Sequence, residues 1–291
     1  MSNTSVAYVA FLRLHWHRLK LYLGFLRHGG RFRWNGELGA WEARKSLPGF
    51  AERGPLGVAV RSMRELRRWI AFFDNPKDPM YRWLGSIGHD GVLWDIGSAN
   101  GLEGCTAAHL NDCQVVFFEP FTPSIETILK SLYLMERAKG VRPRTEVVQA
   151  AIGDKPGFGR FLMHTRPVPG ETLNSLGDAV GSYCYGGRDA VSIGSSQWLK
   201  YASLDEMLET ELPKPTHLKM DIDGLETRAL AGAERLLAMP GLRHAVIEAN
   251  GPTRPEVQAI MTRHGFVQVD DRRHGVSGES ETGDLFFERN A

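Results

Sequence analysis

The chain has 291 residues, of which 24% are charged and 42% are hydrophobic, and its formal net charge is +1. This length allows one large domain or one domain with an appendage, and the apolar fraction is enough for a full core. The balanced charge argues against a nucleic-acid partner. Three cysteines without a CxxC pair indicate neither a disulfide framework nor a zinc site, so we expect a cytoplasmic protein.

Residues 6–28 have the periodicity of an amphipathic helix. Arg13, His17, Lys20 and Arg27 recur at helical spacings and share one face. Two interpretations stay open: the helix packs on the main domain or on a second copy in a homo-oligomer, or it lies on a membrane surface as a basic interfacial helix. The sequence has no run of roughly 18–20 apolar residues that would span a bilayer, and we expect no signal peptide.

The next segment alternates between irregular and helical patterns. Residues 29–57 are rich in Gly, Arg and Trp and predict irregular structure. Residues 60–76 predict a helix that ends before Pro76, because a proline disfavours the helical conformation in the residue that precedes it. Residues 79–87 predict one more short helix. We therefore expect a helical N-terminal extension over residues 1–80.

From residue 91 onward, short apolar runs alternate with helical patterns. Such runs, separated by helices, are typical of a parallel sheet that is covered on both faces. The runs lie at 92–97, 114–120, 145–153, 216–224 and 244–251, with helical patterns at 122–139 and 225–238. Two further apolar runs, 266–270 and 284–289, are joined by a segment without helical periodicity, which predicts an antiparallel last strand.

The segment "LWDIGSANGLEG" (93–104) predicts a ligand site. In open α/β sheets, ligands bind outside the carboxyl ends of the strands, and Gly97, Gly101 and Gly104 would let the backbone approach a ligand. Their spacing is a poor match to the dinucleotide pattern GxGxxG. Asp95 would also repel a diphosphate, so a cationic ligand without phosphate fits better.

S-adenosylmethionine has this chemistry, because it carries an ammonium, a sulfonium and no phosphate. Asp95 could hold its amino-acid end. Glu119, at the end of the second strand, could pair with both ribose hydroxyls through its two oxygens. The alternative is that the aspartate caps a helix and the glutamate is a solvated surface residue.

Five segments resemble, in the same order, those of the FkbM family of S-adenosylmethionine-dependent methyltransferases. They are "WDIGSANG" (94–101), "FFEPF" (117–121), "QAAIGD" (149–154), "SLDEML" (203–208) and "HLKMDIDGLETRALAGAERLL" (217–237). Asp223 stands where the family usually has a glutamate, so the acid at this position has a shorter side chain.

The resemblance covers roughly residues 80–290 and implies an α/β fold. This fold is a Rossmann-like seven-stranded methyltransferase sheet, mostly parallel with an antiparallel last strand, in a domain over residues 81–291. It also implies methyl transfer to a hydroxyl of a sugar, glycan or secondary metabolite. The residues that we assign to cofactor binding are Asp95, Gly97, Ser98, Asn100, Gly101, Glu119, Pro120 and Asp221.

The fourth strand supplies the candidate catalytic residues. A hydroxyl acceptor needs a base to take its proton, and Asp221 is the best candidate. Lys219 lies two residues earlier, on the same face of the strand, and could pair with Asp221 or tune its pKa. The alternative is that Asp221 or Asp223 caps the helix that begins near Leu225. Glu226, in the first turn of that helix, would interact favourably with the helix dipole in either case.

A metal-assisted version of the reaction is a secondary hypothesis. Asp221, Glu248 and Asn250 could present oxygen ligands to magnesium, which would lower the pKa of the acceptor hydroxyl. Glu248 and Asn250 could equally be plain residues of the crevice. We therefore assign no metal ligand.

Residues 157–203 contain many Gly, Ser, Thr and Tyr residues and no clean helix, so we expect an irregular insertion that lines the acceptor pocket. Its candidate contact residues are His164, Arg166, Asn174, Tyr183, Tyr185 and Arg188. The histidine could be solvated and the tyrosines could be loop packing. Asp205 either matches the family's Thr-Leu-Asp motif or caps the next helix.

Three functions compete. The leading one is an S-adenosylmethionine-dependent O-methyltransferase. A nucleotide-dependent oxidoreductase is disfavoured by the missing GxGxxG pattern. The third is a non-catalytic cofactor-binding or membrane-associated scaffold that works through the N-terminal helix.

Overall fold

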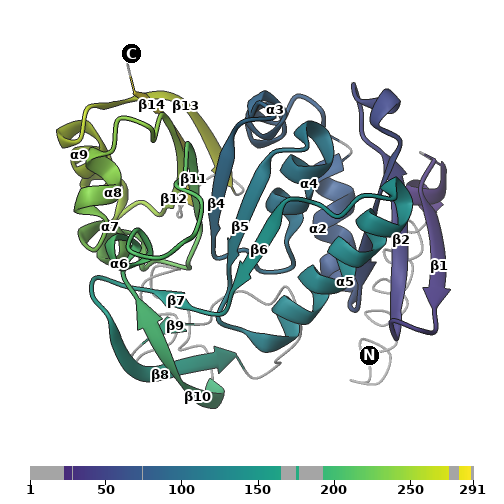
Figure 1. The fold of residues 1–291 in the computed structure, drawn as a ribbon, viewed down its shortest axis with the longest axis horizontal. Coiled ribbons are helices and arrows are strands. Elements are labelled where there is room, and N and C mark those ends of the chain that lie inside the picture. Colours follow the sequence, from purple (N-terminus) through teal and green to yellow (C-terminus); the bar gives the residue numbers. More distant parts are fainter. Residues whose placement is uncertain are drawn as a thin grey trace, which may run out of the picture.

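The structure, a computed structural model, describes residues 23–27, 29–73, 75–164, 175–176, 193–274 and 282–289. Its centre is a seven-stranded sheet with the strand order β13-β14-β12-β11-β4-β5-β6 (Figure 1). In this order the strands are β13 (Phe266–His274), β14 (Thr282–Arg289), β12 (His244–Ala249), β11 (His217–Met220), β4 (Val92–Ile96), β5 (Gln114–Phe118) and β6 (Thr145–Val148). β14 runs antiparallel to both of its neighbours and the other pairs are parallel, as predicted.

Helices cover both faces of this sheet because its strands are apolar on both sides. In β4, Leu93 faces one hydrophobic core and Trp94 faces the other, since successive side chains of a strand point in opposite directions. The first face is covered by α2 (Met63–Phe73), α3 (Pro79–Ser86), α4 (Leu102–Asn111) and α5 (Thr122–Lys139). The second is covered by α7 (Glu226–Ala231), α8 (Glu234–Ala238) and α9 (Arg254–Arg263).

The helices begin and end largely where the sequence predicts. α3 starts after Asp78, whose side chain accepts a hydrogen bond from the Met80 N–H at 2.9 Å. α5 ends at Gly140, which has a φ of +71° and donates its N–H to the Glu136 carbonyl. The helix predicted over 225–238 is divided in two at Gly232, whose backbone lies so close to the backbone of Asp154 that a Cβ would collide with it.

The prediction of irregular structure over residues 29–57 is wrong. This segment forms most of the antiparallel sheet β1-β2-β3, with a short 3-10 helix between β2 and β3, and β3 leads into α2. The strands are β1 (Arg31–Asn35), β2 (Ala40–Ser46) and β3 (Pro55–Val60), and η1 (Ala51–Arg53) precedes β3. The N-terminal extension therefore contains a sheet as well as helices.

The three-stranded sheet packs on α5, which separates it from the central sheet (Figure 1). The Ala59 N–H donates to the Ser131 hydroxyl of α5 at 3.0 Å. On the other side Trp34 and Trp41 pair across β1 and β2 with their rings 5.6 Å apart, and both are about half exposed. Large aromatic residues on a solvent-facing side blur the alternation that would identify these strands.

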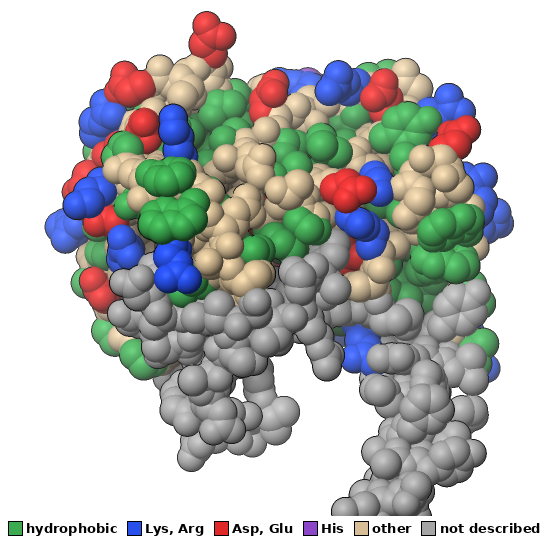
Figure 2. Space-filling model, turned by 90° about the horizontal axis from the view of Figure 1, so that it is seen from below, with side chains coloured by type: hydrophobic (Ala, Val, Ile, Leu, Met, Phe, Trp, Pro, Cys, Tyr) green, Lys and Arg blue, Asp and Glu red, His purple; other side chains and the backbone are tan. Residues whose placement is uncertain are grey.

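The insertion also contains a sheet where irregular structure was expected. β8 (Gly157–His164) and β10 (Ile193–Ala202) form an antiparallel pair, with β7 (Ala151–Ile152) and β9 (Ser175–Leu176) at the edges. The apolar run 145–153 is thus shared between two sheets. On the outer side Phe158 and Trp198 stack at 5.5 Å, and Figure 2 shows hydrophobic side chains between basic ones on this side of the molecule.

Most of the helix predicted over residues 6–28, namely residues 6–22 and residue 28, lies outside the described residues. The end of that helix is described: Phe25 is buried in the core of the first face, 5.6 Å from the Phe32 ring. This contact agrees with packing on the main domain. In the described part of the chain, no helix is both long and apolar enough to span a membrane.

Candidate active site

A pocket lies at the carboxyl ends of the parallel strands, where open α/β sheets bind ligands. It contains about 710 Å³ of space between atoms, part of which is open to solvent. Three strand ends contribute most of its walls: Ile96, Gly97 and Ala99 after β4, Phe118, Glu119 and Pro120 after β5, and Asp221, Ile222 and Asp223 after β11.

The loop after β4 holds its shape through backbone geometry that requires glycine. Gly97 has a φ of +75°, and a Cβ at this position would collide with the Asp221 carbonyl oxygen of the neighbouring strand. The Gly97 and Ser98 N–H groups both donate to the Phe118 carbonyl, at 3.0 and 3.1 Å. The Ser98 hydroxyl donates to the Asp95 carbonyl at 2.6 Å. The loop is therefore anchored to both adjacent strands.

Asp95 lies beneath this loop and does not line the pocket. It is fully buried, and its Oδ1 is 3.3 Å from Lys219 Nζ. Burial raises the pKa of Asp95 to about 6, although the Lys219 charge opposes the shift. Burial would lower the pKa of Lys219, but the surrounding carboxylates outweigh it and raise that pKa. The pair is therefore ionic near neutral pH.

Lys219 links Asp95 to the pocket. Its Nζ donates to the Gly97 carbonyl at 3.3 Å and lies 3.9 Å from Asp221 Oδ2. The predicted proximity of Lys219 and Asp221 is thus confirmed. The structure adds that the shorter ion pair of this lysine is with Asp95, so Lys219 supports both the loop and the pocket acid.

Glu119 lines the pocket on the same face of the sheet as Asp95. Asp95 pairs in register with Phe117, and Glu119 follows two residues later. Its carboxylate accepts the Ala99 N–H at 2.7 Å and the Phe121 N–H at 2.8 Å. Burial raises the pKa of Glu119 to about 7, against the effect of these two hydrogen bonds. Each carboxylate oxygen keeps capacity for a second donor.

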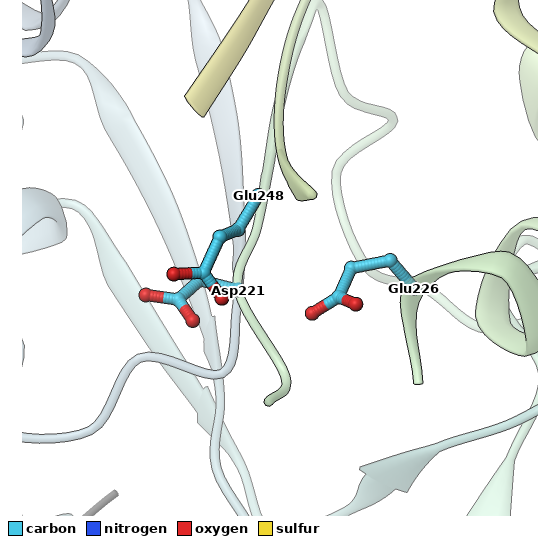
Figure 3. Close-up of side chains that lie close together, drawn as sticks. All are labelled: Asp221, Glu226 and Glu248. Atoms are coloured by element: carbon cyan, nitrogen blue, oxygen red, sulfur yellow. The ribbon is translucent and has the colours of Figure 1, made fainter. Parts of the chain in front are cut away.

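Three carboxylates meet on the side of the pocket where β11 ends (Figure 3). Asp221, Glu226 and Glu248 have oxygens that all lie within 4.8 Å of one another. Burial, together with the charge of Asp221, raises the pKa of Glu248 well above its ordinary range. Burial also raises the pKa of Glu226 to about 7. Like charges this close cannot all ionise, so protons are retained in the cluster.

The prediction that Asp221 or Asp223 caps the following helix is wrong. α7 begins after Leu225, and no side chain caps its N-terminus. Instead the Glu226 Oε1 accepts the Ile222 N–H at 2.9 Å and the Gly224 N–H at 3.2 Å, which closes the turn between β11 and α7. Asp221 is therefore left facing the pocket.

The sequence-predicted cofactor residues divide into two groups. Gly97, Glu119, Pro120 and Asp221 line the pocket. Asp95, Ser98, Asn100 and Gly101 are not among its walls, and all four are buried in or under the loop. Gly101 has a φ of +78° and immediately precedes α4. Their roles toward a cofactor stay predictions.

The insertion contributes to the pocket through Phe161 of β8, a residue that the sequence reasoning did not single out. The side chains expected to contact an acceptor, those of His164, Arg166, Asn174, Tyr183, Tyr185 and Arg188, lie outside the described part of the chain. Their role stays a prediction.

Arg68 of α2 also lines the pocket and was missed. The family resemblance begins near residue 80, so it could not indicate a residue of the extension. The available signal was the helical periodicity of residues 60–76, which shows a helix but not which face meets the site.

The acidic cluster has donor atoms of the kind that hold a divalent cation. Asp221 and Glu248 belong to the predicted magnesium set, and Glu226 joins them. The Asn250 Oδ1 accepts both the N–H and the hydroxyl of Thr253, at 3.1 and 2.9 Å, so it stabilises the turn before α9. The retained protons of the cluster account equally well for the arrangement without a metal.

Asp205 does not cap the helix that follows it, and its role in the family's motif stays a prediction. The helix α6 (Leu204–Met207) is capped by Ser203, which accepts the Glu206 N–H at 3.1 Å. Asp205 instead accepts the N–H groups of Arg235 and Leu236, at 3.0 and 2.9 Å, in the first turn of α8. It stabilises a helix N-terminus far along the chain.

The chain is similar in sequence to a known methyltransferase. The chain is 25% identical over 211 residues to the hexuronic acid methyltransferase AglP of Haloferax volcanii, covering 72% of this chain and 75% of the relative. No family model matches the chain.

Solved structures of methyltransferases are similar at low identity. The methyltransferase FkbM of Methylobacillus flagellatus has 15% identity and a TM-score of 0.45, covering 82% of this chain and 56% of that chain. The magnesium protoporphyrin IX methyltransferase of Synechocystis, solved with bound S-adenosylmethionine, has 10% identity and a TM-score of 0.41, covering 72% and 76%.

Proposed function

We propose that this protein is an S-adenosylmethionine-dependent methyltransferase that methylates a hydroxyl of a sugar or glycan. The observation that carries the proposal is one pocket lined by Glu119 at the carboxyl end of β5 and by Asp221 at the carboxyl end of β11, the two strands that flank β4 and its Gly97 turn. The sequence relative is a hexuronic acid methyltransferase, which supports the same reaction class. Membership of the FkbM family is part of this proposal.

The charges of the pocket suit the proposed cofactor. Glu119, Asp221 and Asp223 line it, and three carboxylates would repel a diphosphate. S-adenosylmethionine presents a ribose diol, an ammonium and a sulfonium instead. Glu119, held in place by two backbone N–H groups, would accept the ribose hydroxyls. This matches the donors of the ligand to the acceptors of the site.

The bound cofactor would supply an electrophilic methyl group. In the proposed reaction the acceptor oxygen bonds to that methyl carbon as the carbon–sulfur bond breaks, and the hydroxyl proton passes to a base. Asp221 is the proposed base, since its carboxylate lines the pocket and lies 3.9 Å from the Lys219 Nζ. The rest of the catalysis is alignment, for which the anchored loop is suited.

The test is a cofactor-product release assay against hexuronic acids, neutral hexoses and aromatic alcohols, each with magnesium and with EDTA. We expect turnover with a sugar hydroxyl, and the same rate in EDTA if the acidic cluster works by holding protons. Loss of activity in EDTA that magnesium restores would assign the cluster to a metal. Absence of S-adenosylmethionine binding in calorimetry of the wild-type protein would refute the proposal.

A peripheral membrane contact or a homo-oligomer interface through residues 6–28 is a separate proposal. Its support is the basic face of the predicted helix. Flotation with anionic vesicles, and sedimentation of the full chain and of a chain that starts at residue 23, would test the two alternatives. Retention of both behaviours after truncation would contradict a role for this helix.

A further inference from the structure

We propose that Arg68, in the N-terminal extension, is a carboxylate-binding residue of the pocket, and that it holds the carboxylate of the cofactor's methionine group. The inference rests on the proposed function. It assigns a ligand contact to α2, a helix that lies outside the segments that resemble the methyltransferase family.

The first observation is the position of Arg68 among the pocket walls. It is the cation among the described lining residues, which also include the acids Glu119, Asp221 and Asp223. Lys219 lies nearby, but it is committed to Asp95 and to the loop and is not part of the wall. Among the described residues that line the pocket, Arg68 is therefore the one whose side-chain charge can bind an anion.

The second observation is that the guanidinium has unused donors. The Arg68 Nη1 is buried and has no hydrogen-bond partner among the described residues. The Arg272 guanidinium, by contrast, has two acidic partners: it pairs with Asp78 at 2.8 Å and with Asp284 at 2.9 Å. A buried charged nitrogen without an acceptor is costly, and a bidentate carboxylate would satisfy it.

The third observation is the charge pattern at this end of the pocket. Burial lowers the pKa of Arg68, but the charges of Glu103, Asp221 and Glu248 outweigh that effect and raise it. Arg68 therefore stays protonated beside a cluster of acids. A cation beside carboxylates complements a zwitterion, in which an ammonium can face the acids and a carboxylate can face the arginine.

An acceptor that carries a carboxylate, such as a hexuronate, could offer Arg68 the same carboxylate group as the cofactor does. Both sources use one site and one type of contact. The experiment therefore needs one arm for the cofactor and one for the acceptor.

In the cofactor arm, calorimetry would compare S-adenosylmethionine with decarboxylated S-adenosylmethionine, which lacks only the carboxylate. We expect the wild-type protein to prefer the complete ligand by about 10- to 100-fold, and Arg68→Gln to lose that preference while it binds the decarboxylated ligand as before. Arg68→Lys should keep part of the preference. The matched control is Arg67→Gln on the same helix, because Arg67 does not line the pocket.

In the acceptor arm, the release assay would compare glucuronate with glucose at saturating cofactor. A rise in KM for glucuronate alone in Arg68→Gln, with unchanged cofactor preference, would support carboxylate recognition but place it on the acceptor. If Arg68→Gln weakened the binding of both cofactor ligands and of both acceptors equally, the inference would be overturned, because Arg68 would then only neutralise the nearby acids. Failure of the wild-type protein to bind either cofactor ligand would instead refute the proposed function. Thermal unfolding of each variant identifies a folding defect, and Arg68→Lys then serves as the test.

Discussion

The two strand ends that line the pocket, those of β5 and β11, hold their carboxylates by different means. Glu119 is fixed by two backbone N–H groups, from the loop after β4 and from the start of α5. Asp221 is instead surrounded by charged side chains: Lys219 lies 3.9 Å away, and Glu226 and Glu248 are the other two acids of its cluster. The first end is a rigid acceptor of hydrogen bonds, whereas the second can exchange protons.

This difference assigns separate tasks to the two ends. A carboxylate bound by backbone amides cannot move, which suits recognition of a diol. A carboxylate in a cluster that retains protons suits acid–base chemistry. Changes at the Asp221 end should therefore affect the rate of transfer, and changes at the Glu119 end should affect affinity and stability.

The largest effect is expected from Asp221→Asn, which removes the proposed base without changing the shape of the side chain. We expect kcat to fall by roughly 10²- to 10⁴-fold, a far larger change than any loss of cofactor affinity. Stopped-flow or release kinetics together with calorimetry would measure both. The matched control is Asp223→Asn, which lies in the same wall outside the cluster and should reduce kcat far less. Equal losses in the two variants would remove Asp221 from its special role.

Gly97→Ala should damage both ends at once. The residue has a φ of +75°, and its new Cβ would strike the Asp221 carbonyl, so the loop and β11 must separate. We expect the free energy of unfolding to fall by about 3 kcal/mol or more, with loss of cofactor binding. Gly140→Ala is the control: its φ is +71° but its surroundings are open, so only about 1 kcal/mol should be lost. Similar losses in both variants would show that backbone strain alone matters.

Glu119→Gln should change how stability depends on pH. The pKa of Glu119 is raised from 4.5 to about 7, so the folded protein keeps this proton while the unfolded chain releases it. Stability is therefore lost as the pH rises from about 4.5 to about 7, by on the order of 2 kcal/mol. A glutamine does not titrate, so the variant does not lose this stability. The difference between its free energy of unfolding and that of the wild type should therefore shift in favour of the variant as the pH rises over this range. Denaturant unfolding at pH 4.5, 6 and 8 measures the gap, and a constant gap would contradict the expected pKa.

The smallest effect is expected from Asp205→Ala, which is remote from both ends. Removing the acceptor of two N–H groups at the start of α8 should cost about 1 kcal/mol of stability. Cofactor affinity and kcat should be unchanged, because Asp205 does not line the pocket. Loss of affinity without loss of stability would instead support the motif role that the sequence indicated.

Much of the central fold was predictable because its signal is local. Apolar runs buried on both faces identify β4, β5, β11 and β12, and the run without helical periodicity before residue 284 indicates the antiparallel pair. The three-stranded sheet was not predictable in the same way. Its exposed Trp34 and Trp41 and its many arginines interrupt the pattern on which strand prediction depends.

The sequence by itself determined the alternation of strands and helices and the position of acids at the strand ends, because both depend on residues close together in the chain. Only the tertiary structure decided which acids meet. Register between β4 and β11 pairs Asp95 with Lys219 and removes Asp95 from the wall. It also decided that Arg68, more than 150 residues before Asp221, shares a pocket with it. Such contacts depend on how whole elements pack, which no local pattern of residues records.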